Sequence, residues 1–269
     1  MGALMGRSAA TRLTYPPPFR RLIIASALEA FLLQAVRVET GRTEANIPTR
    51  GPFVCVFAPH SGWIESLVID ACFNRVGRAW PVWLTKAENR SLPRVLAAGR
   101  LICIDQQDPA PGVVRTIDAL LAQPDAVLAT AIEGTRFGNP ADAQDLSTLG
   151  AFKTGPVRFA TRARVPILPV VVLGAERVVP HLDQVWQGQG SLVALRQIWQ
   201  QIAHPQPIAV RFLPLYRGHL PGGGDLRGVR PAGKALREQA ALHTARLRER
   251  FVAQIRALDP DYPLGAVDL

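Results

Sequence analysis

Two short motifs in this chain carry residue types that acid–base chemistry needs. His60 and Glu65 are five residues apart in Pro59-His-Ser-Gly-Trp-Ile-Glu65, and Glu133-Gly-Thr-Arg136 follows well downstream. A neutral imidazole can take a proton from a hydroxyl, and a nearby carboxylate can fix its tautomer and stabilise the imidazolium that forms. Together with an arginine loop for an anion, these residues suggest acyl transfer onto a polar acceptor.

The second motif has the composition of an anion-binding loop. Gly134 permits a tight backbone turn, Thr135 offers a hydroxyl, and Arg136 offers a planar fork that suits phosphate or carboxylate. The alternative is a turn whose arginine pairs with a surface acid. The His60–Glu65 pair also has an alternative, a capping or core histidine beside a solvated glutamate. Neither motif alone therefore establishes a catalytic or anion-binding site.

The elements that must position these motifs follow from alternating apolar runs and helical stretches. The predicted strands are 52–58, 79–85, 100–104, 126–131, 167–173 and 208–215, and the predicted helices are 64–73, 112–122, 151–163 and 234–258. This alternation predicts an α/β fold, in one domain with a mixed, mostly parallel central sheet flanked by helices. Both motifs then follow strand ends, where α/β sheets bind ligands.

The N-terminal segment is expected to form an amphipathic helix. Residues 22–36 are apolar, follow Arg20 and Arg21, and include Glu29 and Gln34 on one side of a helical projection. The run is shorter than the roughly 20 residues that a spanning helix needs. It fits a bilayer interface, with the arginines at anionic headgroups, and the alternative is packing on its own domain. We therefore expect a helical segment in residues 1–45 and a catalytic α/β domain in residues 46–269.

The charge balance and the cysteine spacing limit which binding partners and which compartment are expected. The 269 residues include 31 basic and 21 acidic side chains, for a formal charge of +10. This excess favours a phospholipid surface, a phosphorylated substrate or an acidic carrier protein, although arginine excess can also reflect genomic base composition. The sequence shows no nucleic-acid recognition module, so no nucleic-acid partner is expected. Its three cysteines lack paired spacing, which predicts no metal site and a reducing cytoplasm.

With these residues in view, the chain resembles the glycerophospholipid acyltransferase family, whose members include the 1-acylglycerol-3-phosphate acyltransferases. Four blocks of that family occur here in order. A His-x4-Asp-like block lies at 60–65, a Gly-x4-Ile-Asp-Arg-like block at 99–106, a Glu-Gly-Thr-Arg block at 133–136 and a Val-Pro-Ile-x-Pro-Val block at 165–170. Phe152-Lys153-Thr154-Gly155 adds a further match.

The resemblance implies an O-acyltransferase of phospholipid biosynthesis that uses a single displacement, without a covalent acyl-enzyme and without a cofactor. His60 would take the proton of the acceptor hydroxyl, which attacks the thioester of the co-substrate, acyl-CoA or acyl carrier protein. The expected acceptor is a lysophospholipid, first of all 1-acylglycerol-3-phosphate, at the cytoplasmic face of the membrane, where the protein is peripheral or interfacially anchored. The expected substrate-binding residues are Glu133, Gly134, Thr135, Arg136, Lys86 and Lys153, with Arg136 on the phosphate.

Three departures from the family pattern bear on the substrate. Glu65 stands where the family has aspartate, and Pro59 and Gly62 replace polar residues beside the base. Gln106 stands where the second block usually ends in arginine, a charge-assisted contact of about 1.5 to 3 kcal/mol. Lys86 is the preferred replacement, with a solvated lysine as the alternative. The departures leave open a non-phosphate lipid acceptor, or an inactive relative that binds lipid.

Overall fold

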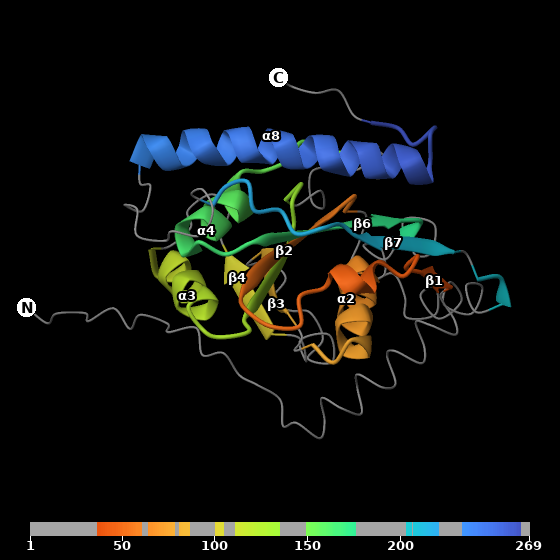
Figure 1. Ribbon diagram of the computed structural model, residues 1–269, viewed down its shortest axis with the longest axis horizontal. Coiled ribbons are helices and arrows are strands. Elements are labelled where there is room, and N and C mark those ends of the chain that lie inside the picture. Colours follow the sequence, from red (N-terminus) through yellow and green to blue (C-terminus); the bar gives the residue numbers. More distant parts are fainter. Residues whose placement is uncertain are drawn as a thin grey trace, which may run out of the picture.

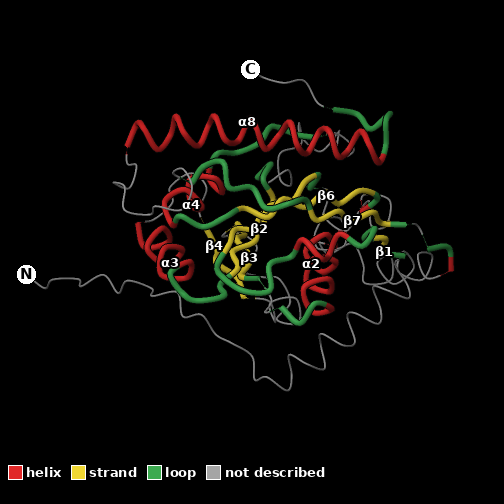
Figure 2. The backbone as a smooth tube through the Cα atoms, in the orientation of Figure 1, coloured by secondary structure: helices red, strands yellow, loops and turns green. Residues whose placement is uncertain are grey.

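A seven-stranded sheet forms the centre of the part of the chain that the computed structural model describes, namely residues 37–60, 64–78, 81–86, 100–104, 111–134, 149–175, 203–205, 207–220 and 233–264. Figure 2 shows the strands between the long helix α8 (Gly233–Leu258) on one side and α2 (Ile64–Arg75) on the other. The expected N-terminal helix lies outside the described residues, as do Gln106, Thr135 and Arg136. No helix in the described ranges has the length and apolar character of a membrane span.

The strand order is β1-β7-β6-β2-β5-β3-β4. The strands are β1 (Val38–Glu39), β2 (Phe53–Ala58), β3 (Val82–Lys86), β4 (Arg100–Ile104), β5 (Val127–Ala131), β6 (Ile167–Leu173) and β7 (Ile208–Phe212). Neighbouring strands are parallel except for the antiparallel pair β6 and β7. The predicted mixed, mostly parallel sheet is therefore confirmed, with all six predicted strands in place. Its seventh strand, β1, is only two residues long and was not predicted.

Helices cover both faces of the sheet (Figure 1). They are α2 (Ile64–Arg75), α3 (Pro111–Leu121), α4 (Gly155–Ala163) and α8 (Gly233–Leu258), with a short 3₁₀ helix η1 (Thr43–Asn46). Side chains alternate along β2, because successive residues of a strand point to opposite faces. Val54 and Val56 pack with α3, α4 and α8, whereas Cys55 and Phe57 pack with α2. Each face of the sheet therefore has its own apolar core.

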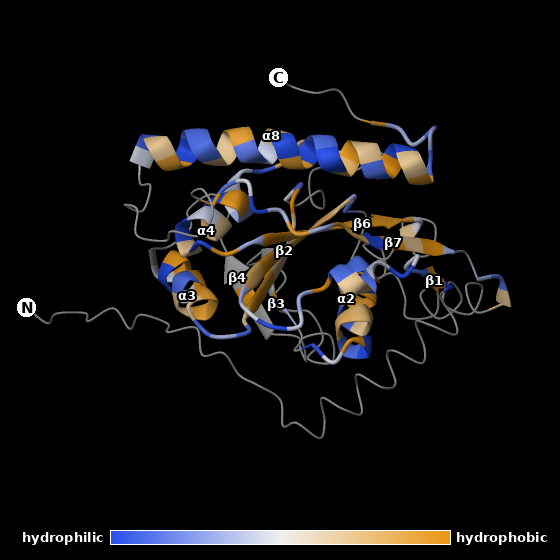
Figure 3. Ribbon diagram, viewed as in Figure 1, coloured by the Kyte–Doolittle hydropathy of each residue, from blue (hydrophilic) through white to orange (hydrophobic). Residues whose placement is uncertain are grey.

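The predicted helices 151–163 and 234–258 both form, but the first starts later than expected. It begins at Gly155, and the Lys153 amide before it donates instead to the Ile132 carbonyl of a distant segment at 2.7 Å. Pro156 lies in the first turn, where its missing N–H costs no hydrogen bond. In α8 the predicted apolar side is buried, with Leu247, Phe251 and Ile255 in one core cluster with residues of β2, β6 and α4. Figure 3 shows hydrophilic and hydrophobic residues alternating along α8.

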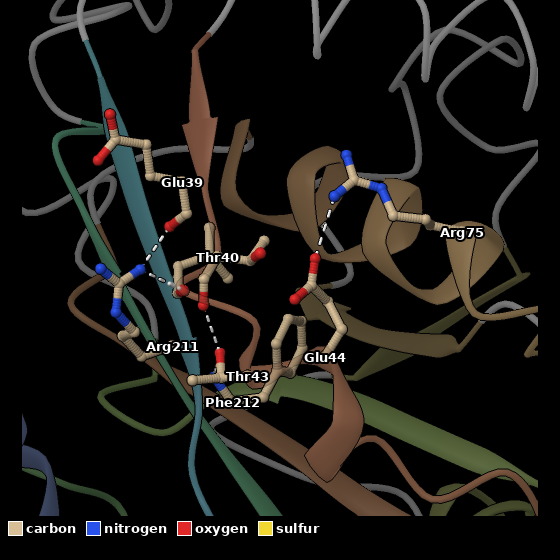
Figure 4. A network of polar contacts seen from close by, with 8 residues as sticks. Glu39, Thr40, Thr43, Glu44, Arg75, Arg211 and Phe212 are labelled. Atoms are coloured by element: carbon tan, nitrogen blue, oxygen red, sulfur yellow. Dashed lines mark hydrogen bonds and ion pairs between the residues drawn. The ribbon is translucent and has the colours of Figure 1, made fainter.

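Polar contacts fasten the β1 edge to the sheet (Figure 4). Arg211 of β7 donates to the Glu39 carbonyl. The Thr43 hydroxyl accepts the amide of the last residue of β7 at 3.0 Å. Glu44 of η1 forms a 3.0 Å ion pair with Arg75 at the end of α2. These contacts place residues 38–46 at the edge of the sheet, and the division expected at residue 45 stays a prediction.

Candidate active site

The two motifs that could do chemistry meet at the carboxyl edge of the sheet. β2 and β5 are parallel neighbours, and their last paired residues are Phe57 and Ala131. His60 and Glu133 each follow their strand by two residues. The His60 amide donates to Glu133 Oε2 at 3.0 Å, although the two residues are 73 positions apart. Strand pairing thus brings together the two motifs that the sequence separates.

Glu133 bridges two backbone segments. Its side chain is buried, with 3% of the residue exposed. While Oε2 accepts the His60 amide, Oε1 accepts the Gly150 amide at 2.7 Å. The carboxylate therefore ties the loop that carries His60 to the segment that leads into α4. Sequence reasoning missed this contact because its partners are backbone amides, which no side-chain pattern marks. The predicted role of Glu133 in acceptor binding stays a prediction.

The segment around Gly150, which Glu133 ties to the His60 loop, is held in turn by α8 and the residues that follow it. Leu149, next to Gly150, forms a bridge with Leu264. Phe152 packs edge-to-face on Phe251 of α8, with ring centroids 5.3 Å apart. Because aromatic rings favour an edge-to-face arrangement, this contact holds the segment that supplies the second amide to Glu133 against α8.

The imidazole of His60 packs against an aromatic side chain. Phe57 contacts it edge-to-face at 5.3 Å between ring centroids, and Phe57 in turn contacts Trp83 of β3 at 5.8 Å. The indole N–H of Trp83 donates to Asp70 Oδ1 of α2 at 3.0 Å. A chain of contacts from α2 through β3 and β2 therefore limits where the half-buried imidazole can lie.

Glu65 is the second residue of α2 and is fully buried. In the described part of the chain, His60 Nδ1 and Glu65 Oε2 are among the buried atoms that make no hydrogen bond, although both residues have other contacts. The hydrogen bond expected from one ring nitrogen of His60 to the Glu65 carboxylate stays a prediction, as does the orienting role of Glu65.

Gly134 and Lys153 lie against each other beside this bridge. Gly134 has φ 75, a left-handed conformation that favours glycine, and a Cβ added there would meet Lys153 Cγ at 3.1 Å. The exposed Lys153 side chain therefore passes directly over the backbone of the arginine motif. Lys86 is the last residue of β3 at the same edge of the sheet. The binding roles predicted for these residues, and for Thr135 and Arg136, stay predictions.

Two buried cysteines are poor candidates for a nucleophile. Cys55 and Cys72 are both buried. Burial, and then the charge of Asp70, raise the pKa of the Cys55 thiol well above its usual range. At neutral pH that thiol stays protonated, whereas the thiolate is the nucleophilic form. Among the described residues, no group of three or more histidine, cysteine or acidic side chains is arranged to hold a metal ion.

The chain matches a protein-family model and is similar to a solved structure. A family model described as Acyltransferase matches residues 39–173, half of the 269-residue chain. No curated protein matches the chain. Among solved structures, it is similar to the 1-acyl-sn-glycerophosphate acyltransferase PlsC from Thermotoga maritima, with 18% identity and a TM-score of 0.49, over 90% of this chain and 85% of that one. The match to the family model runs from β1 to the end of β6 and includes His60, Glu65 and Glu133, and the chain therefore belongs to the acyltransferase family.

Proposed function

We propose that this protein transfers a fatty acyl group from acyl-CoA or an acyl carrier protein to the hydroxyl of a lysophospholipid, with 1-acylglycerol-3-phosphate as the first candidate, at the cytoplasmic face of a membrane. The observation that carries the proposal is the bond between the His60 amide and Glu133 Oε2, at 3.0 Å. It joins the histidine motif to the arginine motif at the edge of the sheet where α/β proteins bind ligands. The family match supports acyl transfer as the reaction.

In the proposed reaction, His60 acts as general base. Its imidazole takes the proton of the acceptor hydroxyl while the oxygen attacks the thioester carbonyl, which gives a tetrahedral oxyanion. Collapse of this intermediate breaks the carbon–sulfur bond, and the imidazolium gives its proton to the departing thiolate, which leaves as the thiol. Glu65 would stabilise the imidazolium between these steps. The products are the acylated lipid and free CoA or carrier-protein thiol, so all atoms and protons balance.

The hydrogen bonds of the loop limit which groups can stabilise the oxyanion. The His60 amide already donates to Glu133, and the Gly150 amide donates to the same carboxylate. Neither is therefore the donor that an oxyanion requires. We assign that task to backbone amides elsewhere in the loop between β2 and α2.

Basic residues support an anionic acceptor. Lys153 lies over Gly134, and Lys86 ends β3 at the same edge of the sheet. With Arg136 they would place three cations around one headgroup, in a chain of formal charge +10. Gln106 in place of the usual arginine supports one alternative, a lipid acceptor without a phosphate. In that case the charge at this edge would serve the phosphates of the acyl donor instead.

A panel of acceptors tests the proposal. Purified protein is incubated with labelled acyl-CoA or acyl carrier protein and either lysophosphatidate, lysophosphatidylcholine or monoacylglycerol. We expect the highest kcat/KM with lysophosphatidate, and a rise of about tenfold for Gln106→Arg, as one charge-assisted contact is restored. Preference for monoacylglycerol would support the non-phosphate acceptor. Lipid binding without transfer to any acceptor would contradict the enzymatic proposal.

A further inference from the structure

A cavity lies at the end of the β2 strand opposite to His60. It has a volume of about 240 Å³ and is lined by Pro48 and residues 50–53 at the start of β2, by residues 164–166, which lead into β6, and by Leu215 and Arg217, which follow β7. His60 follows the other end of β2, which is six residues long. At about 3.3 Å per residue the two ends are roughly 20 Å apart. This cavity is therefore separate from the candidate active site.

Three arginines from three different segments line the cavity. They are Arg50, Arg164 and Arg217, and none of the described lining residues is acidic. The acid of the neighbouring loop, Asp125, accepts the Gly51 amide at 2.5 Å and an Arg78 N–H at 3.3 Å. The hydrogen bond from Gly51, and then Arg78 and Arg50, hold the pKa of that carboxyl below its usual range. Even with Asp125 ionised beside Arg50, the three lining arginines outnumber this acid and leave the cavity electropositive.

The conformation of Arg164 shows that helix geometry alone does not explain the arginine. Arg164 ends α4 in the left-handed region, with φ 57 and ψ 41, and its amide bonds to the carbonyls of Ala160 and Thr161. Helices commonly end this way with glycine or asparagine. Another L-residue costs about 1–2 kcal/mol there. An arginine at this position therefore brings a guanidinium group to the cavity, although the left-handed backbone conformation is unfavourable for it.

We propose that this cavity is an anion site that binds a phosphoryl group and is distinct from the site of acyl transfer. Guanidinium groups match the geometry of phosphate oxygens in a bidentate manner. The volume corresponds to about eight water molecules at about 30 Å³ each, which accommodates a phosphate or diphosphate. The phosphoryl group belongs either to a soluble molecule or to an anionic lipid headgroup.

Calorimetric titration of the full chain with sodium diphosphate tests the proposal. The starting variant is Arg136→Gln, which removes the anion contact proposed for the active site. On this background we expect Arg164→Gly and Arg217→Gln each to weaken diphosphate binding about tenfold. Arg164→Gly should leave the melting temperature unchanged or raise it, since glycine relieves the left-handed strain. The matched control is Arg237→Gln, an exposed arginine of α8, which should change nothing.

Vesicle flotation then identifies the source of the phosphoryl group. If the Arg164 and Arg217 variants also lose binding to phosphatidylglycerol vesicles but not to phosphatidylcholine vesicles, the ligand is a lipid headgroup. If vesicle binding is unchanged while diphosphate binding falls, the ligand is soluble. Diphosphate affinity equal to that of the starting variant would overturn the proposal. A lower melting temperature of Arg164→Gly with unchanged affinity would show that the arginine is structural.

Discussion

Glu133→Gln separates the two roles that a carboxylate at this position could have. In the structure both oxygens accept backbone amides, from His60 at 3.0 Å and from Gly150 at 2.7 Å. Glutamine keeps the size of the side chain but presents an NH₂ group in place of one oxygen. Because an NH₂ group cannot accept an amide proton, one buried N–H loses its partner.

The size of the effect follows from these two bonds. A hydrogen bond to a charged group contributes about 1.5 to 3 kcal/mol. At roughly 2–4 °C per kcal/mol for a chain of this size, the melting temperature should fall by about 3 to 12 °C. The His60 loop should also shift, and a misplacement of about 1 Å can cost roughly a hundredfold in rate. We therefore expect kcat to fall about ten- to a hundredfold, with KM for the acceptor nearly unchanged.

Thermal unfolding and steady-state kinetics of the same preparation measure both effects. The matched control is Glu238→Gln, because Glu238 is exposed on α8 and pairs with Lys234 at 3.7 Å. Exposed pairs of this kind contribute little, so the control should melt within about 1 °C of the wild type. An increase in KM for the acceptor with an unchanged melting temperature would refute the bridging role. It would show instead that Glu133 contacts the substrate.

Three further predictions concern stability, pH and the arginine motif. Burial lowers the pKa of His219 to about 4 from 6.5 despite the 2.7 Å hydrogen bond of its Nε2 to Val165, so the unfolded chain binds more protons between these values. The free energy of unfolding should thus drop by about 3 kcal/mol as pH falls through this window, and urea titrations at several pH values should show a smaller drop in His219→Phe, which keeps the contribution of His243, whose pKa burial also lowers. The buried Arg78 donates to the carbonyls of Thr49 and Gly51 and to Asp125, which lies between α3 and β5. Arg78→Lys loses part of these hydrogen bonds, so it should lower the free energy of unfolding, measured in urea, by about 2–4 kcal/mol. Gly134→Ala should lower kcat/KM for the lysophospholipid, since its left-handed φ of 75 disfavours alanine and the added Cβ displaces the side chain that crosses it.

The strands were predictable because each is an apolar run bounded by turn residues, and parallel strands buried on both faces read that way. All six residues of β2, for example, are buried. Two bounds depended on contacts between distant residues. β1 is a two-residue strand that pairs with β7, and the start of α4 is set by a bond from Lys153 to the Ile132 carbonyl. Neither contact has a signature in the local sequence.

The candidate site, too, could be predicted only in part from the sequence. The sequence placed His60 and Glu133 at strand ends, and the adjacency of β2 and β5 brings them into hydrogen-bonding distance. Strand order is a tertiary property, so their direct contact could not be predicted from spacing. Sequence reasoning also assigned Glu133 only to the substrate, because a carboxylate beside an arginine motif suggests ligand binding and backbone amides leave no pattern.

The central claim is that His60 is the general base of acyl transfer, and its most direct test is the rate of labelled acyl transfer to lysophosphatidate by His60→Ala. The matched control is His204→Ala, since His204 is exposed. A general base contributes about 10² to 10⁴ in rate. We predict that His60→Ala loses at least a hundredfold in kcat, at an unchanged melting temperature, while the control transfers acyl groups like the wild type. Transfer by His60→Ala within about threefold of the wild type would contradict the claim.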